Sequence, residues 1–205
     1  MTVLDTATIA KSITLSEGFA EDERNRVAEI YADAFEGKLG RILGGGSRMR
    51  GFLAESLQPE FALVARDGQT REIIGILGVR TESGGLTTGF DRTMPRHYGW
   101  FGTFWRMRIL ELLETPERAD KLLIDGIAVA IDRRGEGIGG ALIAAAETKA
   151  HRYGKCALRL DVIDRNLRAR ALYARLGFIE TGTHDLGMLR HVFGFARATQ
   201  MTKML

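Results

Sequence analysis

A cluster of glycines between residues 134 and 140 has the composition of a phosphate-binding turn. The segment reads Arg134-Gly135-Glu136-Gly137-Ile138-Gly139-Gly140, after an apolar stretch and before a helical pattern. Glycines let successive backbone N–H groups point into one space without side chains, and a helix N-terminus adds partial positive charge. We expect this turn to bind a phosphate or pyrophosphate. A tight strand-to-helix turn without a ligand would have the same pattern.

Two other nucleotide-binding motifs compete for the same glycines. A P-loop is excluded because no Lys follows the last glycine. The dinucleotide-binding fingerprint matches Gly135, Gly137 and Gly140, with Asp161 about 20 residues further on. That motif follows its strand at once and opens a domain, whereas here residues 130–134 intervene and the turn lies late in the chain. A nicotinamide-dependent oxidoreductase therefore stays as an alternative.

A second pattern with chemical content follows the glycine turn. Its residues are spaced as Asn-x-x-Ala-x-x-Leu-Tyr-x-x-x-Gly-Phe, at Asn166, Ala169, Leu172, Tyr173, Gly177 and Phe178. Asn166 and Tyr173 are two helical turns apart, so they share one helix face at a separation of about 10 Å. Asn166 is expected to cap the helix. Without a ligand, Tyr173 would be a core tyrosine whose hydroxyl bonds the backbone.

Together the two patterns resemble the GNAT superfamily of N-acetyltransferases. The family's signature is Arg or Gln, two residues, Gly, one residue, then Gly or Ala, which Arg134, Gly137 and Gly139 match. The lead-in 127–133 is also similar to the family, although Ile131 stands where many members have Pro. The second pattern is similar to the family's later motif. The resemblance covers residues 122–181, and the N-terminal third matches only in the order of its elements.

The resemblance implies a single N-acetyltransferase domain over residues 1–205. The implied α/β fold has a mixed, mostly antiparallel sheet with a central splayed parallel pair and helices on both faces. Acetyl-CoA would lie between the strands 122–131 and 157–163, with its pyrophosphate on the glycine turn. Backbone groups of Ile127 and Val129 would bind its pantetheine arm and thioester carbonyl. The implied cofactor-binding residues are Ile127, Val129, Arg134, Gly135, Gly137, Ile138, Gly139, Gly140 and Asn166.

The implied reaction is direct attack of a primary amine on the acetyl thioester. An alkylammonium with a pKa near about 10.4 must first lose a proton, which a carboxylate can accept. Asp125 is our candidate base, because strand alternation places Asp125, Ile127 and Val129 on one face. The alternative is a strand Asp bonded to the backbone or to an Arg. Tyr173 is expected to lie beside the sulfur and to protonate the departing thiolate.

The elements that must position these residues are visible as periodic patterns. Asp67-Gly68 is a turn dipeptide between two apolar strands and predicts an antiparallel hairpin. Glycines at 37, 40 and 44–46 interrupt the first helical regions, and residues 81–96 are expected to be irregular. The predicted helices are 20–36, 38–57, 97–114, one from 138 and 166–176. The predicted strands are 61–66, 73–80, 122–131, 157–163, 178–181 and 192–197.

Composition restricts the class of protein further. A hydrophobic content of 45% in 205 residues is enough for one sizeable core. No apolar run reaches the roughly 18 residues of a membrane helix, and no signal peptide is recognisable, so we expect no membrane partner. The single Cys156 excludes a disulfide within the chain and a cysteine-rich zinc site. We therefore expect a cytoplasmic protein without a metal.

The remaining expectations concern partners. Lys and Arg number 29 against 26 Asp and Glu, and no block of like charges occurs, which favours an anionic ligand over nucleic acid. The expected acceptor is a small-molecule amine or a peptide amine. The aromatic run of Tyr98, Trp100, Phe101, Phe104 and Trp105 favours core or interface packing, and from it we expect a homodimer. A non-catalytic CoA-binding regulatory module is the other alternative.

Overall fold

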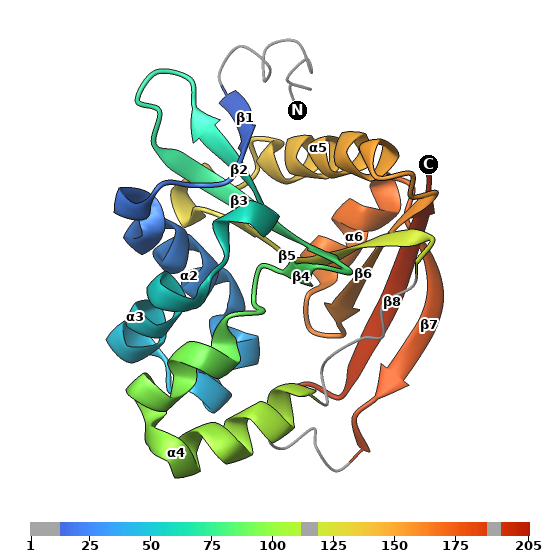
Figure 1. The fold of residues 1–205 in the computed structure, drawn as a ribbon. Helices are drawn as coiled ribbons and strands as arrows, with labels where there is room; N and C mark the ends of the chain where they lie inside the picture. Colours follow the sequence, from blue (N-terminus) through green and yellow to red (C-terminus); the bar gives the residue numbers. More distant parts are fainter. Residues whose placement is uncertain (1–12, 112–118, 188–193) are drawn as a thin grey trace.

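One eight-stranded sheet runs through the computed structural model, which describes residues 13–111, 119–187 and 194–205 (Figure 1). The strand order is β1-β2-β3-β5-β6-β8-β7, and β4 pairs with β3. Within these residues β5 and β6 form the one parallel pair. This is the predicted mixed, mostly antiparallel sheet. The strands are β1 Ile13–Glu17, β2 Ala62–Asp67, β3 Ile73–Thr81, β4 Gly84–Gly85, β5 Lys121–Val129, β6 Ala157–Ile163, β7 Ile179–Asp185 and β8 Arg197–Met204.

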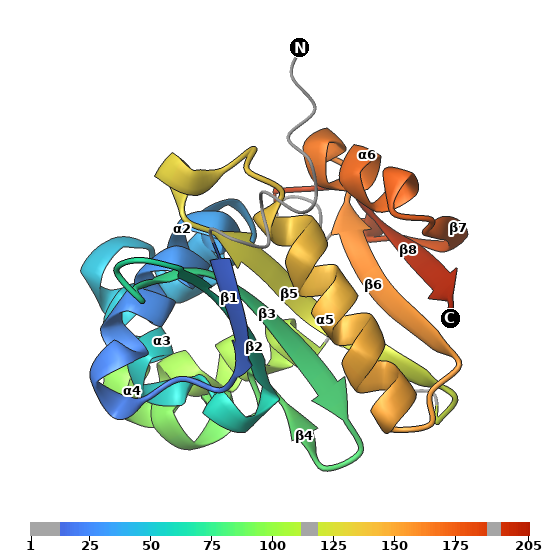
Figure 2. The same ribbon diagram turned by 90° about the horizontal axis from the view of Figure 1, so that it is seen from above.

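Helices cover both faces of the sheet, so that each face buries its own core (Figures 1 and 2). On one face, α2, α3 and α4 bury Val27, Phe52 and Met94. On the other face, α5 buries Leu142 against strand residues such as Leu158. The helices are α2 Arg24–Leu43, α3 Gly46–Ser56, α4 Phe90–Glu111, α5 Ile138–Arg152 and α6 Leu167–Arg175. Short 3₁₀ turns are η1 Glu21–Glu23, η2 Pro59–Phe61 and η3 Ile131–Arg133.

Helix α5 lies unusually close to the sheet at its first turn. A Cβ added to Gly75 on β3 would come within 2.9 Å of Ile138 Cγ2 and within 3.3 Å of Leu142 Cδ1. Glycine at this position therefore allows the start of α5 to pack directly on the strand. The residues that α5 buries, Ile138, Leu142, Ala146 and Ala150 among them, recur every four residues along one side of the helix. This packing fixes the position of the glycine turn that precedes the helix.

The predicted hairpin is confirmed, with a turn longer than two residues. Strands β2 and β3 pair antiparallel on either side of residues 68–72. Asp67 Oδ1 accepts hydrogen bonds from the backbone N–H groups of Gln69 at 2.9 Å and Thr70 at 3.0 Å. An Asp side chain that bonds the backbone two residues on is typical of such turns.

The predicted helix boundaries were wrong in the N-terminal half. Helix α2 continues through Gly37 and Gly40 to Leu43, because an interior glycine costs only about 1 kcal/mol and Ile42 and Leu43 are fully buried. Helix α4 starts at Phe90, inside the stretch expected to be irregular. It carries Pro95 within the helix and bends at Gly99, whose φ is 65°. The last part of the predicted helix 97–114 lies outside the described residues.

The last predicted strand was also misplaced. Strand β8 occupies Arg197–Met204 instead of 192–197, of which 192–193 lie outside the described residues. Thr199, Met201 and Thr202 of this strand are buried, whereas Arg197 and Met204 at its two ends are exposed. The prediction at 178–181 is confirmed, because β7 runs over Ile179–Asp185. The predicted strands 122–131 and 157–163 correspond to β5 and β6.

Candidate functional site

The parallel strands β5 and β6 separate halfway along their length. Their register runs from Lys121–Ala157 to Ile124–Leu160 and ends there. Beyond that point β5 stays paired with β3 and β6 stays paired with β8. Among the described residues, no strand pairs with the edges that face each other beyond this point, as predicted for a splayed pair. The cleft between them is lined by Ala34, Phe35, Gly37, Ile124, Asp125, Gly126, Ile127, Leu160, Asp161, Val162, Ile163, Asn166 and Tyr173.

A β-bulge interrupts β5 inside this cleft. Opposite β3, Gly126 pairs with Gly78 while Ile124 pairs with Val79, so Asp125 is the extra residue. A Cβ on Gly126 would lie 2.5 Å from the ring of Phe35 on α2, so the bulge requires glycine. Glycine within a strand is a known sign of a bulge or of a close backbone approach.

The bulge changes the face on which Asp125 lies. Ile127 and Val129 pack with the core under α5. Asp125 instead contacts Arg80 on β3. Val79, the residue before Arg80, packs in the core under α5, and successive strand residues point to opposite faces. Arg80 and Asp125 therefore lie on the face covered by α2. The prediction that Asp125, Ile127 and Val129 share one face was therefore wrong, because simple alternation ignores the extra residue.

Asp125 is almost fully buried and is held by an ion pair. Arg80 Nε donates to Asp125 Oδ1 at 2.9 Å, and only 8% of the Asp125 side chain is exposed. Arg80 also donates to Thr87 Oγ1 at 3.2 Å. In the part of the chain that the structure describes, Asp125 Oδ2 has no hydrogen-bond partner. A Cβ on Gly85 would lie 2.7 Å from that oxygen, so glycine makes room for it.

Tyr31 of α2 completes the surroundings of Asp125 and was not singled out from the sequence. Its ring stacks on Phe35 at a centroid distance of 4.4 Å. Burial, and secondly the charge of Asp125, raises the pKa of the Tyr31 hydroxyl well above its usual value. The phenol therefore stays protonated beside the carboxylate. Within the sequence Tyr31 was indistinguishable from any apolar residue on a helical stripe.

Helix α6 brings Asn166 and Tyr173 to the other side of the cleft. Asn166 is the N-cap, and its Oδ1 accepts the N–H of Ala169 at 3.1 Å, as predicted. Tyr173 packs against Phe178 at a ring distance of 5.8 Å. Burial raises the pKa of the Tyr173 hydroxyl to about 12. Among the residues described, nothing hydrogen-bonds this hydroxyl, so the expectation of a core tyrosine with a backbone partner is not met.

The backbone of β5 directs alternate groups into the cleft. Ala130 donates its N–H to Ile74 on β3 at 2.9 Å. In an antiparallel pair, the backbone N–H and C=O groups of successive residues point in opposite directions. The N–H and C=O groups of Val129 and Ile127 therefore point away from β3 and toward β6. The Val129 carbonyl accordingly accepts from Arg134 Nε at 3.1 Å and not from β3.

The glycine turn ends at the N-terminus of α5, as predicted. Gly135 and Gly137 have φ of 94° and 81°, which favour glycine. Gly137 is the N-cap and supplies no side-chain cap, so the first N–H groups of α5 are available to a ligand. Ile138 is buried, and its side chain faces the core, so only its backbone is available to a ligand.

Gly139 and Gly140 have a second role in packing. Added Cβ atoms would lie 3.4 Å from Leu172 and 3.9 Å from Leu176, respectively, both at the α6 segment. The two glycines therefore face this segment at close range. An alanine would fit at either position with ordinary van der Waals contacts, so packing on this segment does not by itself require glycine.

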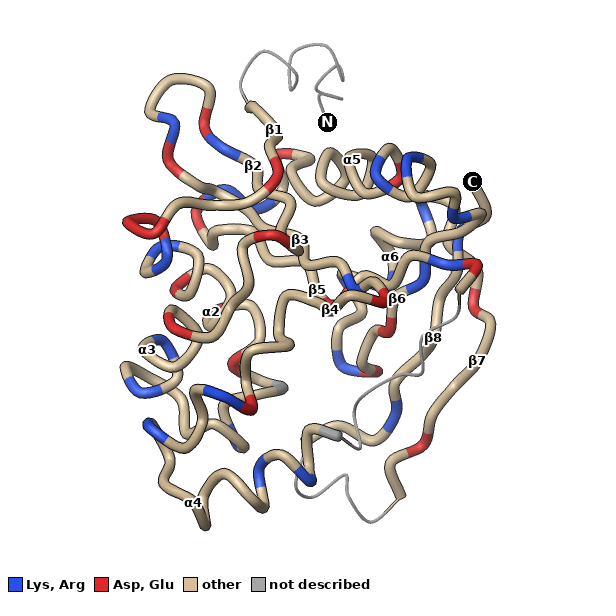
Figure 3. Tube along the Cα trace, viewed as in Figure 1, with Lys and Arg blue, Asp and Glu red and all other residues tan. Residues whose placement is uncertain are grey.

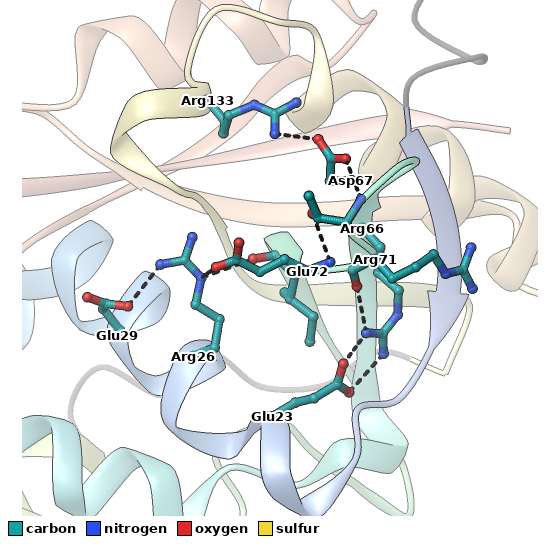
Figure 4. A network of polar contacts seen from close by, with 10 residues as sticks. Glu23, Arg26, Glu29, Arg66, Asp67, Arg71, Glu72 and Arg133 are labelled. Atoms are coloured by element: carbon teal, nitrogen blue, oxygen red, sulfur yellow. Dashed lines mark hydrogen bonds and ion pairs between the residues drawn. The ribbon is translucent and has the colours of Figure 1, made fainter.

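An ion-pair network ties the β2–β3 hairpin to the glycine turn (Figure 4). Arg133 Nη1 lies 2.7 Å from Asp67 Oδ2, and Arg133 Nη2 lies 3.0 Å from Glu136 Oε2. Hydrogen bonds from the Thr70 backbone and from Arg133 lower the pKa of Asp67 to about 2. Arg133 thus holds the Glu136 carboxylate and connects the turn to the hairpin, a contact that no sequence pattern indicated.

The structure does not support the dinucleotide-binding alternative. That fold requires several parallel strands on either side of the crossover, whereas the described residues contain one parallel pair. Over the same residues, no group of three His, Cys, Asp or Glu side chains is arranged to hold a metal ion. None of the described helices is long and apolar enough to cross a membrane. Charged residues of both signs are interspersed over the fold (Figure 3).

Comparison with known proteins identifies similar sequences and structures. The sequence model of the Acetyltransferase (GNAT) family matches residues 24–178. A solved acetyltransferase structure is 20% identical, with a TM-score of 0.61 over 93% of this chain and 98% of the other. A GCN5-related N-acetyltransferase from Kribbella flavida is 15% identical, with a TM-score of 0.61 over 96% and 99%. A GNAT family acetyltransferase from Elizabethkingia anophelis with acetyl-CoA bound is 16% identical, with a TM-score of 0.57 over 95% and 99%. The search of curated proteins gave no match.

Proposed function

Because this chain belongs to the Acetyltransferase (GNAT) family, we propose that it transfers an acetyl group from acetyl-CoA to a primary amine. The acceptor is a small-molecule amine or a peptide amine. The observation that carries the proposal is the separation of β5 and β6 beyond Ile124 and Leu160. This separation leaves a cleft between the two strands. Tyr173 of α6 lines one side of the cleft, and the buried carboxylate of Asp125 also lines it.

The residues present fit acetyl-CoA in this cleft. The uncapped N-terminus of α5 supplies N–H groups and partial positive charge for a pyrophosphate, with Arg134 exposed beside it. The backbone groups of Ile127 and Val129 that face the cleft would bind the amide groups of an extended arm. The Asn166 side-chain amide would donate from the opposite side. When bound, acetyl-CoA supplies the thioester that carries the acetyl group.

The charges of the cleft favour a cationic acceptor. Two carboxylates, Asp125 and Asp161, are among the lining residues, and no Lys or Arg is. An amine arrives at neutral pH as an ammonium ion, which carboxylates attract. Asp125 Oδ2 would accept the proton that the amine must lose, since Oδ1 is already bonded to Arg80. The protonated Tyr31 adjoins this carboxylate without adding positive charge.

Tyr173 would supply the proton for the leaving sulfur. Its hydroxyl is protonated at neutral pH, because burial raises its pKa to about 12. It lines the cleft from α6, and it donates to no protein acceptor among the described residues. A phenol in this state is an available general acid.

We expect the reaction to occur in the cytoplasm. Cys156 is a free, exposed thiol whose Sγ donates to the Asp120 carbonyl at 3.2 Å. Such a thiol stays reduced in a reducing compartment.

The test is a panel of amines assayed for CoA release from acetyl-CoA. The panel contains polyamines, amino acids, aminoglycosides and peptides with a free N-terminus. Product mass is measured in parallel. We expect CoA release that depends on the amine, together with an amine that has gained one acetyl group. Acetyl-CoA binding without turnover of any amine would favour a regulatory module, and CoA release without acetylated amine would indicate hydrolysis.

A further inference from the structure

Helix α4 exposes four large aromatic side chains to solvent. After the bend at Gly99, the exposed fractions are 82% for Trp100, 94% for Phe101, 72% for Phe104 and 40% for Trp105. We call these four residues the outer aromatic face. Their spacing of one and four residues places them together on one side of the helix. The predicted alternative of core packing therefore does not hold for them.

Other apolar residues of α4 pack on the core on both sides of the bend at Gly99. Phe90 and Met94 are buried in the core under α2 and α3, and Tyr98 packs edge-to-face on Phe52 at 5.4 Å. Tyr98 Oη donates to the Leu43 carbonyl at 2.7 Å. After the bend, Met107, Ile109 and Leu110 pack against the same core. These contacts hold both parts of the helix, with the outer aromatic face turned to solvent. A helix that is apolar on both sides is typical of one that is buried on both sides.

The charges around this face favour an apolar protein surface over a membrane or nucleic acid. Residues 99–105 contain no charged side chain, and the centre of α4 is uncharged in Figure 3. Arg106 follows directly, but its Nε donates inward to the Ile42 carbonyl at 2.7 Å and its Nη1 donates to Gly102. Its guanidinium also lies 4.2 Å from the Trp105 ring centroid. Arg108, one turn after Phe104, is exposed but already has a partner within the protein. An interfacial membrane helix would instead direct several basic side chains outward, toward anionic lipid.

We propose that the outer aromatic face is the contact surface for a second copy of this chain. Buried aromatic side chains cover about 150–250 Å² each, so the exposed parts of these four present roughly 600 Å². This is at or above the largest apolar patch of a typical monomer. Two copies would together bury roughly 1,200 Å² through these residues alone, the lower end of stable interfaces. An uncharged, self-complementary patch suits a two-fold axis, where each copy offers the same surface.

The experiment is sedimentation velocity on the full chain from about 1 to 100 µM, a range that brackets micromolar dissociation constants. The parent is compared with Phe101→Glu, which places a charge at the centre of the face. Phe101 is almost fully exposed, so the fold should not change, and a melting curve verifies this. The matched control is Ile179→Glu on β7, since Ile179 is also exposed, at 64%. A parallel arm mixes each protein with vesicles of phosphatidylserine and phosphatidylcholine.

We expect the parent and Ile179→Glu to sediment at twice the chain mass of 22.7 kDa. Phe101→Glu should sediment as a monomer, with a dimer dissociation constant raised by about 30-fold or more, as for an aromatic hot spot. A parent that stays monomeric over the whole series would overturn the proposal. So would a dimer that Phe101→Glu leaves intact, which would place the interface elsewhere. A monomeric parent that binds vesicles through Phe101 would assign the face to a membrane surface instead.

Discussion

Arg80 Nε lies 2.9 Å from Asp125 Oδ1 at the point where β5 bulges. The ion pair connects two neighbouring strands and keeps one carboxylate oxygen bonded while the other has no partner among the described residues. Removing one member of such a buried pair leaves an uncompensated charge, which costs about 3–5 kcal/mol. The pair therefore fixes the direction of the carboxylate within the cleft.

Replacing Asp125 by Asn should lower kcat/KM most strongly at low pH. Asn keeps the size of the side chain and can still accept from Arg80, but it cannot accept a proton. It also leaves Arg80 without its counter-charge, so a melting curve must first show that the variant is folded. The variant can then use only amine molecules that are already neutral. The neutral fraction of an amine with a pKa near about 10.4 rises about tenfold for each pH unit below that pKa. The deficit should therefore shrink as the pH rises.

Rates of parent and variant across the pH range check this prediction. Asp33→Asn is the control, because Asp33 also forms an ion pair, with Arg50 at 3.0 Å, but lies outside the cleft. A ratio of parent to variant rates that is the same at every pH would leave Asp125 with a structural role only.

Replacing Tyr173 by Phe should lower kcat by about 10²-fold, the lower end for general acid catalysis, because a CoA thiol is a fairly good leaving group. Affinity for acetyl-CoA should change little. The melting temperature should also stay close to that of the parent, since the hydroxyl bonds no described residue. A core tyrosine losing a hydrogen bond would instead cost about 1 kcal/mol of stability and leave kcat unchanged.

Steady-state rates and thermal melts on the same samples separate these two outcomes. Tyr153→Phe is the control, since Tyr153 is half exposed at the far end of α5. Near-parental kcat in Tyr173→Phe would remove the tyrosine from the reaction.

Replacing Asp67 by Asn should weaken acetyl-CoA binding while kcat stays constant. Asn can still accept the N–H groups of the turn, but its charge-assisted contact with Arg133 is lost. Surface ion pairs of this kind correspond to a change of about 2–5-fold in Kd. Glu72→Gln is the control, because Glu72 lies in the same hairpin but pairs with Arg26. Calorimetric titration should show a weaker Kd for Asp67→Asn alone, and equal values would mean that the hairpin does not position the turn.

The same contact has a defined dependence on pH. The folded-state pKa of Asp67 lies near about 2, below its ordinary value of 3.8. The stability that this carboxylate contributes is therefore fully present above pH 3.8 and is lost as the pH falls toward about 2. The free energies of unfolding of the parent and of Asp67→Asn should therefore become equal as the pH falls through that range. A difference in stability between the two proteins that stays unchanged from neutral pH down to about pH 2 would contradict the assignment.

Local sequence patterns correctly predicted the glycine turn, helix α5 and the start of helix α6, which form the C-terminal part of the site. The glycine turn, the buried stripe of α5 and the Asn166 cap depend on contacts near in sequence, so their spacing specifies them. The hairpin at Asp67 is equally local. The helix boundaries in the first half failed because burial of Ile42 and Leu43 outweighs the preference of Gly37 and Gly40 for other conformations.

The bulge, and with it the orientation of Asp125, depends on contacts far apart in the chain. Gly126 carried the signal, since a strand glycine often marks a bulge, but alternation alone placed Asp125 on the wrong face. The proximity of Arg80 and Tyr31 arises from strand pairing and from the packing of α2 on the sheet. Neither residue belongs to a local motif, so no spacing rule could have found them.

Calorimetric titration of acetyl-CoA into a matched pair of glycine variants tests the central claim most directly. Gly137 and Gly154 lie at the two ends of α5, with φ of 81° and 64°, so Asp at either position carries similar strain and the same charge. We expect the parent and Gly154→Asp to bind acetyl-CoA equally well. Binding by Gly137→Asp should be weaker by at least about tenfold, which corresponds to about 1.4 kcal/mol. A folded Gly137→Asp that binds acetyl-CoA as tightly as the parent, or a parent that does not bind it, would contradict the account.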